Sequence, residues 1–334
     1  MICGASFHHL PSIRTLAFIY TIAGVDCIDV AADPAVVRAA RAGIALALER
    51  DARASAPWVM ASFNDGSDPH FRKVSLLSTS CPSDCLQPCV AACPPGAIAV
   101  TGHRAEVSSD LCYGCGRCLP LCPPQLLAAS DRTIAAGDVM PSLVAAGIQA
   151  IELHTQVGRR DEFARLWQQC QPWVDRLELV AASCGDGEGL EAYLRDLEQL
   201  MQPRSPHLIW QIDGRPMSGD IGGGATRAAV RLAAKVAEMR LPGSLQLAGG
   251  TNDSTAAKVR RAGIPVAGIA FGSYARQLVA DVCQAPLDLE TFVLDRDDSP
   301  LQCALDRART LVSDLKASSL MPAALARSPV ARLH

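Results

Sequence analysis

Short apolar runs alternate along the chain with amphipathic stretches of helical periodicity. The runs have the length of strands and end in turn-forming residues, and most are followed by a segment whose apolar residues recur every three or four positions. We predict strands at residues 2–7, 27–31, 58–63, 150–154, 177–181, 208–213, 245–248 and 266–271. We predict helices at residues 12–23, 35–49, 139–146, 161–169, 189–201, 226–238, 254–262 and 274–282. This alternation predicts a parallel sheet with helices on its outside.

The alternation within single strands favours a closed barrel. A strand that is buried on both faces of an open sheet is apolar throughout. Here Glu152 and His154 share one face of their strand and the neighbouring apolar residues share the other, and residues 27–31 and 208–213 repeat the pattern. A barrel interior that becomes polar at its C-terminal mouth explains this alternation. We therefore predict an α/β fold with a (β/α)8 TIM-like barrel, with an open α/β sheet as the alternative.

Residues 81–123 carry eight cysteines in two half-motifs, each of which ends in Cys-Pro. The second half-motif has the spacing of bacterial two-cluster ferredoxins, Cys112-x-x-Cys115-x-x-Cys118-x-x-x-Cys122-Pro123. The first is wider, Cys81-x-x-x-Cys85-x-x-x-Cys89-x-x-x-Cys93-Pro94. A zinc ribbon would show two separated Cys-x-x-Cys knuckles, and disulfides need an oxidising compartment. The pattern therefore predicts two iron–sulfur clusters in a ferredoxin-type module.

The fourth cysteine of such a half-motif ligates the other cluster, so the ligands should cross between the two halves. One predicted ligand set is Cys112, Cys115, Cys118 and Cys93, and the other is Cys81, Cys85, Cys89 and Cys122. We expect [4Fe-4S] clusters, and the wider spacing of the first half-motif leaves its site open between a four-iron and a [3Fe-4S] cluster. Residues 96–100 and 105–107 predict the small strand pair of the module.

The cysteine module interrupts the third strand–helix unit of the predicted barrel. We predict the first part of the barrel at 1–75, the inserted module at 76–130 and the rest of the barrel at 131–285. Residues 286–334 are predicted to hold a helix at 300–316 followed by a disordered tail. Because loops at the C-terminal face of a barrel tolerate insertions, the clusters should lie over or beside the barrel mouth.

The composition is that of an ordinary soluble globular protein. The 334 residues are 49% hydrophobic and 19% charged, and the formal net charge is −3. This balance argues against a nucleic-acid partner or a membrane-surface role based on charge. No apolar run is long enough for a transmembrane segment, and we expect a cytoplasmic protein. The remaining six cysteines are expected to be buried free thiols, namely Cys3, Cys27, Cys170, Cys184, Cys283 and Cys303.

Glycines follow three of the predicted strands. They are Gly222 and Gly223 after the sixth strand, Gly249 and Gly250 after the seventh, and Gly272 with Ser273 after the eighth. In many barrels the loops after strands seven and eight hold a phosphate through backbone amides, so a phosphorylated metabolite or a flavin would fit here. The alternative is that these glycines serve tight turns only.

Polar residues cluster at the predicted mouth. They are Asp29, Asp33, Asn64, Asp65, Glu152, His154, Asp213 and Arg215. The Glu152 and His154 pair could carry out acid–base chemistry near neutral pH. We favour the alternative that these groups hydrogen-bond one another in a polar interior, because spacing alone assembles no nucleophile or metal triad. No catalytic residue is assigned, and the loop histidines His8, His9, His70 and His103 receive no role.

Four segments together resemble the cyanobacterial light-dependent-period (LdpA) family of iron–sulfur proteins. They are Ile2-Cys3-Gly4-Ala5-Ser6-Phe7, Asp26-Cys27-Ile28-Asp29-Val30-Ala31-Ala32-Asp33-Pro34, the double cysteine motif, and Ala248-Gly249-Gly250-Thr251-Asn252. The resemblance implies a redox-active protein that conveys light-dependent redox state to the circadian clock, with clock-input proteins as partners and a link to quinones. It also leads us to expect a short polar leader before Ile2.

Two other functions are compatible with the same residues. One is a flavin- or phosphate-ligand-binding barrel oxidoreductase that receives electrons from its own ferredoxin module. The other is a plain electron carrier. A complete flavin site with a proton donor at the mouth would favour the enzyme, and the glycine loops supply only half of it. Whether the protein is an enzyme therefore stays open at the level of the sequence.

Overall fold

The computed structural model describes residues 1–131, 133–202, 207–215, 224–283, 289–294 and 299–316. Its main feature is a parallel sheet of eight strands that follow one another in chain order. The strands are β1 (Ile2–Gly4), β2 (Cys27–Ala31), β3 (Trp58–Asn64), β8 (Ala150–Thr155), β9 (Leu179–Gly185), β10 (His207–Asp213), β11 (Ser244–Ala248) and β12 (Gly268–Ile269). Each lies within or overlaps one of the eight apolar runs, so the predicted strand order is confirmed.

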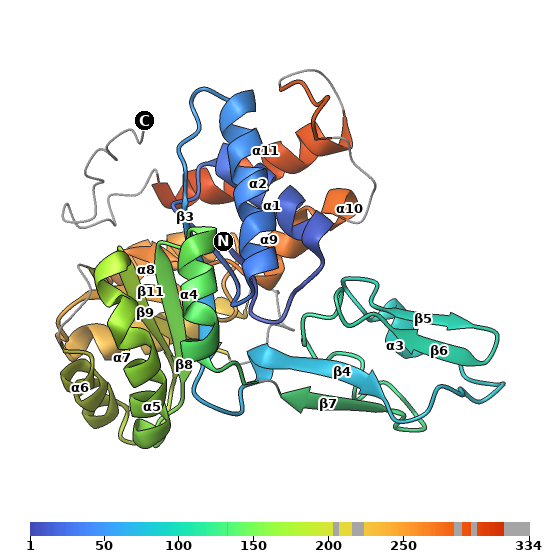
Figure 1. Ribbon diagram of the computed structural model, residues 1–334, viewed down its shortest axis with the longest axis horizontal. Coiled ribbons are helices and arrows are strands. Elements are labelled where there is room, and N and C mark those ends of the chain that lie inside the picture. The colour runs from blue at the N-terminus through green and yellow to red at the C-terminus, as the bar shows by residue number, and fades with distance from the viewer. Residues whose placement is uncertain (132, 203–206, 216–223, 284–288, 295–298, 317–334) are drawn as a thin grey trace.

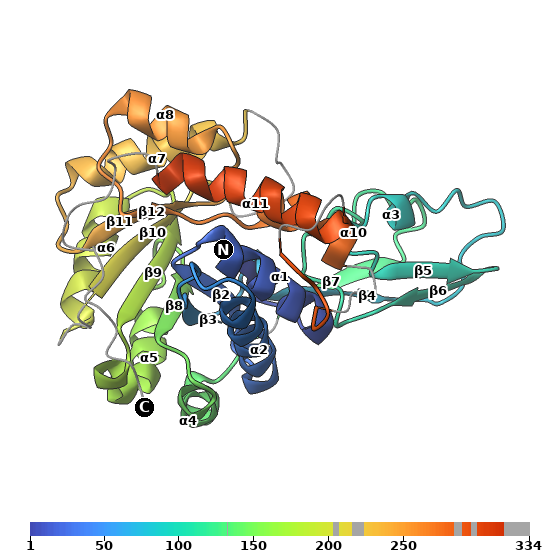
Figure 2. The same ribbon diagram turned by 90° about the horizontal axis from the view of Figure 1, so that it is seen from above.

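The sheet is curled into a half-barrel, as the turned view in Figure 2 shows. Strand pairing runs from β1 at one edge to β12 at the other. The amide of Ile2 donates a hydrogen bond of 2.9 Å to the carbonyl of Phe271, just beyond β12. Across the described residues, these two edge strands form no ladder with each other. The α/β class and the parallel sheet are thus as predicted, while closure into a (β/α)8 barrel stays a prediction.

Helices lie on the outside of the curled sheet (Figure 1). They are α1 (Leu10–Ala23), α2 (Pro34–Arg50), α4 (Ala136–Ala146), α5 (Arg160–Cys170) with the 3-10 turn η2 (Gln171–Arg176), α6 (Leu190–Leu200), α7 (Thr226–Glu238), α8 (Thr255–Ala262), α9 (Ser273–Leu278), α10 (Ala280–Cys283) and α11 (Pro300–Lys316). The helix predicted at 300–316 is α11. None of the helices in the described parts of the chain is both long and apolar enough to cross a membrane.

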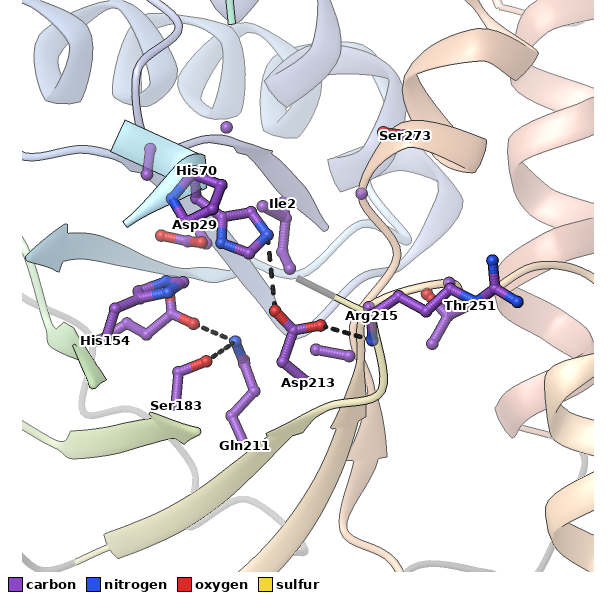
Figure 3. A pocket seen from close by; sticks show the side chains of 18 of the residues that line it. Ile2, Asp29, His70, His154, Ser183, Gln211, Asp213, Arg215, Thr251 and Ser273 are labelled. Carbon is purple, nitrogen blue, oxygen red and sulfur yellow. Dashed lines mark hydrogen bonds and ion pairs between the residues drawn. The ribbon is translucent and has the colours of Figure 1, made fainter. Parts of the chain in front are cut away.

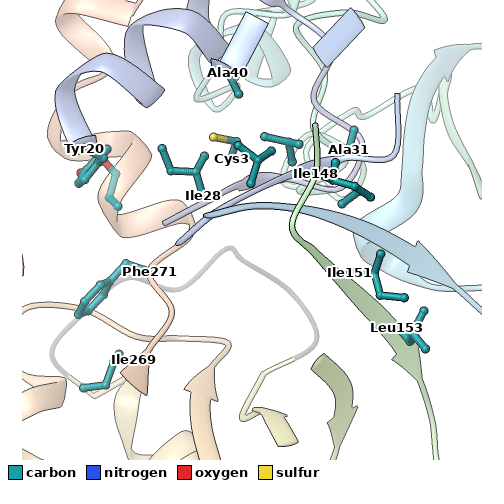
Figure 4. Packing of buried hydrophobic residues seen from close by; sticks show 14 of the residues in the cluster. Cys3, Tyr20, Ile28, Ala31, Ala40, Ile148, Ile151, Leu153, Ile269 and Phe271 are labelled. Atoms are coloured by element: carbon teal, nitrogen blue, oxygen red, sulfur yellow. The ribbon is translucent and has the colours of Figure 1, made fainter. Parts of the chain in front are cut away.

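One hydrophobic core fills the space between the sheet and its helices. Figure 4 shows Cys3 and Ile28 from the first two strands packed near Ala40 of α2. Helix α1 is buried along most of its length because it packs between α2 and α11. At its end Tyr20 donates a hydrogen bond of 2.7 Å to the carbonyl of Ala275. This bond ties the first helix to the last strand–helix unit.

The chain between β3 and α4 leaves the sheet and projects to one side (Figures 1 and 2). It contains the short turn η1 (Pro69–Phe71), β4 (Arg72–Leu76), α3 (Pro88–Ala91), β5 (Ile98–Thr101), β6 (Arg104–Val107) and β7 (Leu127–Asp131). Strand β5 pairs with β6, as predicted, and β4 pairs with β7 in a second antiparallel ribbon. The predicted boundaries at 75/76 and 130/131 fall in this second ribbon, and the domain division stays a prediction.

The projecting segment has a small core of its own. Its buried residues are Val74, Cys89, Ala97, Ile98, Cys112, Cys118, Cys122 and Leu127. Half of these are cysteines of the double motif, so the thiols take the place that aliphatic side chains occupy in an ordinary core. Leucines and valines that are partly buried pack around these residues, and a group bound by the thiols would lie among them.

Two predictions concern residues outside the described part of the chain. These are the glycine pair Gly222 and Gly223 and the tail that begins at Ala317. A third prediction is wrong in part, because not all six remaining cysteines are buried. Cys303 is exposed, since it lies on the outward face of α11, while Cys3, Cys170 and Cys184 are buried.

Candidate functional site

All fourteen cysteines lie in the described residues, and none of them forms a disulfide. Among the eight of the double motif, Cys89, Cys112, Cys118 and Cys122 are buried, and the other four are partly buried. They therefore line the interior of the projecting segment and are not scattered over its surface.

The thiols of the double motif fall into two groups of electrostatic neighbours. Burial, and after it the charges of the neighbouring Cys115, Cys93 and Cys112, raise the pKa of Cys118 to about 12. Burial also raises the pKa of Cys93, and Cys115 and Cys112 add to this effect. Cys93 and three cysteines of the second half-motif are therefore close in space.

The other four cysteines behave in the same way. Burial raises the pKa of Cys81, followed by the effect of Cys85 and Cys122. For Cys89, burial raises the pKa first and Cys122 second, with a smaller effect from Cys81. Cys122, the last cysteine of the second half-motif, thus lies among the cysteines of the first.

Backbone amides point at several of the sulfurs. The amide of Ala97 lies 3.2 Å from Sγ of Cys93, that of Leu126 lies 3.3 Å from Sγ of Cys122, and that of Val74 lies 3.5 Å from Sγ of Cys112. Amide hydrogen bonds to sulfur stabilise thiolates and set the electronic properties of a metal group bound to them. The local backbone therefore suits thiolate ligands.

The loop between Cys112 and Cys115 packs tightly on the start of β4. Gly114 has a φ of +70°, and a Cβ there would lie 2.3 Å from the carbonyl oxygen of Arg72. The guanidinium of Arg72 donates a hydrogen bond of 3.0 Å back to the carbonyl of Gly114. A glycine is needed here both for the backbone conformation and for the close approach.

The same loop forms one wall of a pocket at the mouth of the sheet. Tyr113 and Gly114 line this pocket together with residues at the C-terminal ends of the parallel strands. Figure 3 shows the side chains of Gln211 and Asp213, which extend from β10 into the same pocket. The cysteine segment and the sheet therefore meet at one site, at the face where parallel α/β sheets bind ligands.

Two histidines and three carboxylates form a network inside this mouth pocket. His154 Nε2 lies 2.8 Å from Glu152 Oε2, and His154 Nδ1 lies 3.5 Å from Asp68 Oδ2. His70 Nδ1 lies 2.9 Å from Asp68 Oδ1, and His70 Nε2 lies 3.5 Å from Asp213 Oδ2. Asp68 is therefore placed between the two rings, and each ring reaches a second carboxylate on its other side.

The ion pairs of this network shift the pKa values of its histidine and carboxylate groups in opposite directions. Burial alone would lower the pKa of His154, but the charge of Glu152 and the hydrogen bond to Asp68 raise it well above its ordinary value. Burial would raise the pKa of Asp68, but hydrogen bonds from His154 and His70 hold it well below its usual range. Burial would lower the pKa of His70 as well, but the hydrogen bond to Asp68 and the charge of Asp213 raise it above its ordinary value.

Asp29 and Glu152 share the hydroxyl of Ser62. The Ser62 Oγ lies 2.7 Å from Glu152 Oε2 and also hydrogen-bonds Asp29. Burial and the charge of Glu152 raise the pKa of Asp29 well above its usual value. His154 has the opposite effect on Glu152 and, despite burial, lowers its pKa. The mouth therefore pairs one carboxyl that favours its proton with one that releases it.

The structure brings most of the predicted mouth residues together. Asp29, Glu152, His154, Asp213, Arg215, Gly249, Gly250, Gly272 and Ser273 all line the pocket. Asp65 lies outside the lining and is 3.3 Å from the guanidinium of Arg159, while Asp33 accepts a hydrogen bond of 2.7 Å from the amide of Ala35 at the start of α2. Asn64 donates a hydrogen bond to the carbonyl of Gly66.

His70 and Asp68 were missed by sequence reasoning. Its place in a loop gives His70 no role in the sequence, but in the structure it bridges Asp68 and Asp213 and is one of the two imidazoles of the network. The signal that could have found it is local. In Asp68-Pro69-His70, the Asp68 side chain accepts a hydrogen bond from the His70 amide and caps the turn η1, which fixes both side chains beside the sheet.

The packing also explains one of the glycine loops. Gly249 has a φ of +64°, and a Cβ there would lie 1.6 Å from Oδ1 of Asp213. Gly250 has a φ of +82°, and its Cβ would lie 2.9 Å from the carbonyl oxygen of Ala225. These glycines make room for the Asp213 carboxylate and the neighbouring backbone. An anion cradle at this loop stays a prediction.

A cysteine-lined module set against the mouth of a parallel α/β sheet defines a protein built to hold iron–sulfur groups. Residues 81–133 match the LdpA Fe-S cluster-binding domain, and residues 142–314 match the light dependent period A C-terminal domain. Over an alignment of 341 residues, the chain is 47% identical to the protein named Light dependent period A of Synechococcus elongatus. The alignment covers 98% of this chain and 95% of that relative. The chain belongs to the light dependent period A family.

Proposed function

We propose that this protein is an iron–sulfur redox protein that senses cellular redox state and relays it to a circadian clock. The observation that carries the proposal is the convergence of the eight thiols into two groups inside a segment that matches an iron–sulfur-binding domain. The link to light and period comes from the name of the Synechococcus relative. Bound clusters would supply reversible one-electron chemistry without a substrate.

Each proposed cluster has four ligands. One set is Cys112, Cys115, Cys118 and Cys93, and the other is Cys81, Cys85, Cys89 and Cys122. The electrostatic neighbours support this division, because Cys93 is influenced by the second half-motif and Cys81 by Cys122. We propose [4Fe-4S] clusters, with the first half-motif open to a [3Fe-4S] cluster.

The contacts of the Cys112–Cys115 loop provide a route for the relay. Tyr113 and Gly114 line the mouth pocket, and Arg72 connects the loop to the turn that holds His70. At an effective dielectric constant of about 20, one charge at about 10 Å is worth about 1.7 kcal/mol. That is enough to change the affinity of a charged ligand by more than about tenfold.

The proposal also includes two features of the fold, namely a closed barrel and a ferredoxin-type module. The hydrogen bond between Ile2 and Phe271 supports closure of the sheet into a barrel, and the β5–β6 hairpin supports a ferredoxin-type module at 76–130. We propose a cytoplasmic protein whose partners are clock-input proteins, with quinones or other carriers as sources of electrons.

One observation favours a second function. The mouth pocket combines a wall made by the cysteine loop with glycine loops and with acid–base groups at the strand ends. This arrangement would suit an oxidoreductase that binds a flavin or a phosphorylated ligand beside a cluster. We keep the oxidoreductase as the alternative and not as the main proposal, because Glu152 and His154, the acid–base pair that it would use, form an ion pair with each other.

A potentiometric titration of anaerobically purified protein tests the proposal and separates it from the alternative. We expect broad cluster absorbance that bleaches reversibly on reduction, with no flavin bands. Flavin bands, or turnover of an added substrate at the mouth, would favour the oxidoreductase. Protein that retains no iron, or whose iron cannot be cycled reversibly, would contradict both functions.

A further inference from the structure

Asp68, His70 and His154 converge on one point of the mouth pocket, away from the cysteines. One ligand atom from each residue lies within 4.8 Å of the other two. Asp68 and His70 come from the turn η1, which begins the excursion from the sheet, and His154 comes from the end of β8. Two imidazoles and one carboxylate form a ligand set typical of divalent transition metals.

The outer ring nitrogens show the arrangement expected around a metal. Histidines that bind metals almost always donate their other ring nitrogen to a carboxylate or carbonyl, which fixes the tautomer and the ring orientation. Both rings here present Nδ1 to Asp68 and Nε2 to a second carboxylate, which is Glu152 at 2.8 Å for His154 and Asp213 at 3.5 Å for His70. The two carboxylates would therefore serve as the supporting shell.

The neighbouring side chains hold the rings in place. The ring of Phe71 meets the ring of His154 edge-on, with centroids 5.2 Å apart and an angle of 81° between the planes. The two imidazole centroids are 5.3 Å apart. The amide of His70 donates a hydrogen bond of 2.7 Å to Asp68. A site of this kind needs ligands that are fixed before the metal arrives.

The side that faces the pocket is open to a further ligand. His70 and His154 line the pocket beside Gln211 of β10. Gln211 donates through its Nε2 to Ser183 and Glu152, which leaves its Oε1 as an acceptor that is buried and has no donor among the described residues (Figure 3). A water on a metal, or a ligand in the pocket, would supply that donor.

We propose that Asp68, His70 and His154 bind one divalent transition-metal ion, with its remaining positions facing the mouth pocket. Glu152 and Asp213 act as positioning residues that orient the two imidazoles. The charge favours this ion, because the carboxylates of Asp68, Glu152 and Asp213 surround two rings that are neutral when they bind a metal. Two protons on the rings would balance the same charge, and the experiment below separates the two arrangements.

The experiment uses the protein loaded with its clusters and kept anaerobic. Mn²⁺ is added first, because it prefers oxygen and nitrogen ligands and should leave the thiolates alone. Free Mn²⁺ is measured by electron paramagnetic resonance, and its ligands by nitrogen modulation of the electron spin echo. Equilibrium dialysis against Zn²⁺ provides a second metal of higher affinity. We expect one ion per chain and modulation from imidazole nitrogens.

Variants test the identity of the ligands. His70→Gln and His154→Gln should each weaken binding more than tenfold, and Glu152→Gln should weaken it by about 10- to 100-fold through the ring it orients. His103→Gln, an exposed histidine on the turn between β5 and β6, is the matched control and should bind as the parent protein does. Iron and sulfide contents should be equal in all of them, which shows that the clusters are intact.

Two results would overturn the proposal. One is the absence of saturable binding of both Mn²⁺ and Zn²⁺ to the parent protein, or bound Mn²⁺ that shows no nitrogen modulation, which would leave the protonated ion-pair network. The other is unchanged affinity in His70→Gln and His154→Gln. Because the spin-echo measurement needs only the parent protein, it decides the question even where a variant fails to fold.

Discussion

The guanidinium of Arg276 lies over the ring of Tyr113, 4.4 Å from the ring centroid. Tyr113 sits between two cysteines of the double motif, and Arg276 belongs to α9 behind the last strand of the sheet. Arg276 also donates hydrogen bonds to the carbonyls of Ile2 and Cys3, at 2.9 and 3.2 Å. One side chain therefore connects the cysteine loop with both edges of the curled sheet.

Replacing this side chain should loosen all three connections. Arg276→Gln removes a cation–π contact of about 1–2 kcal/mol and leaves two carbonyls without their donor. We expect a lower midpoint of thermal unfolding than for the parent protein, measured by circular dichroism. Arg38→Gln on the exposed face of α2 is the control and should have little effect. Equal shifts in the two variants would show that the Tyr113–Arg276 contact contributes nothing.

Two glycines of the cysteine segment give a matched test of its packing. Gly114 and Gly96 have φ values of +70° and +63°, so alanine is strained at both. Only at Gly114 would a Cβ meet backbone, at 2.3 Å from the Arg72 carbonyl, whereas nothing lies within 4 Å of a Cβ at Gly96. Gly96→Ala should cost about 1–2 kcal/mol and keep its iron.

Gly114→Ala should cost more and lose iron from the cluster held by Cys112 and Cys115. Iron analysis after anaerobic purification measures the difference between the two variants. Equal iron in the two proteins would mean that the loop can move away from β4 without harm to the proposed cluster.

Alkylation at pH 8 should sort the cysteines by environment. Burial raises the pKa of Cys3, Cys27, Cys170 and Cys184 to about 12, so only about one thiol in ten thousand is a thiolate at that pH. Lowering the pH decreases this fraction further. With clusters in place, iodoacetamide should label Cys303, which is exposed.

Removing the clusters with a chelator should then add the eight cysteines of the double motif to the labelled set. Peptide mass spectrometry measures the labelling of each site. Rapid labelling of Cys112 or Cys118 before the chelator is added would argue against their role as ligands.

The crossed ligand sets predict opposite effects of two similar variants. Cys93→Ser should damage the cluster held by Cys112, Cys115 and Cys118. Cys122→Ser should damage the cluster of the first half-motif instead, although Cys122 follows the second half-motif in sequence. Electron paramagnetic resonance of both variants, oxidised and reduced, distinguishes the two clusters. Loss of the same signal in both variants would contradict the crossing.

Much of the main sheet could be predicted from local sequence. In β8 the alternation of Glu152 and His154 with apolar residues marks a strand with one polar face, and the structure places both side chains in the mouth. The last strand was less well predicted, because only Gly268–Ile269 of residues 266–271 pairs in the sheet. Only Gln246 and Leu247 of β11 pair with this strand. An apolar run in the sequence does not show how many of its residues pair with the neighbouring strand.

Long-range relationships could not be predicted in this way. Strand β4 pairs with β7 across the whole cysteine segment, with Val74 opposite Ala129, and neither strand carries a local signal for the other. The network around Asp68 depends in the same way on three segments meeting in space. The sequence makes Gly249 part of a possible anion cradle, whereas in the structure the close approach of the Asp213 side chain is enough to require a glycine there.

The central claim is that the chain holds two iron–sulfur clusters, and its most direct test is the metal content of anaerobically purified protein. Iron and acid-labile sulfide should be measured together with electron paramagnetic resonance of the oxidised and reduced states. We predict about eight irons per chain, or about seven with a three-iron cluster at the first half-motif. Protein that contains zinc in place of iron, or a single cluster, would contradict the account.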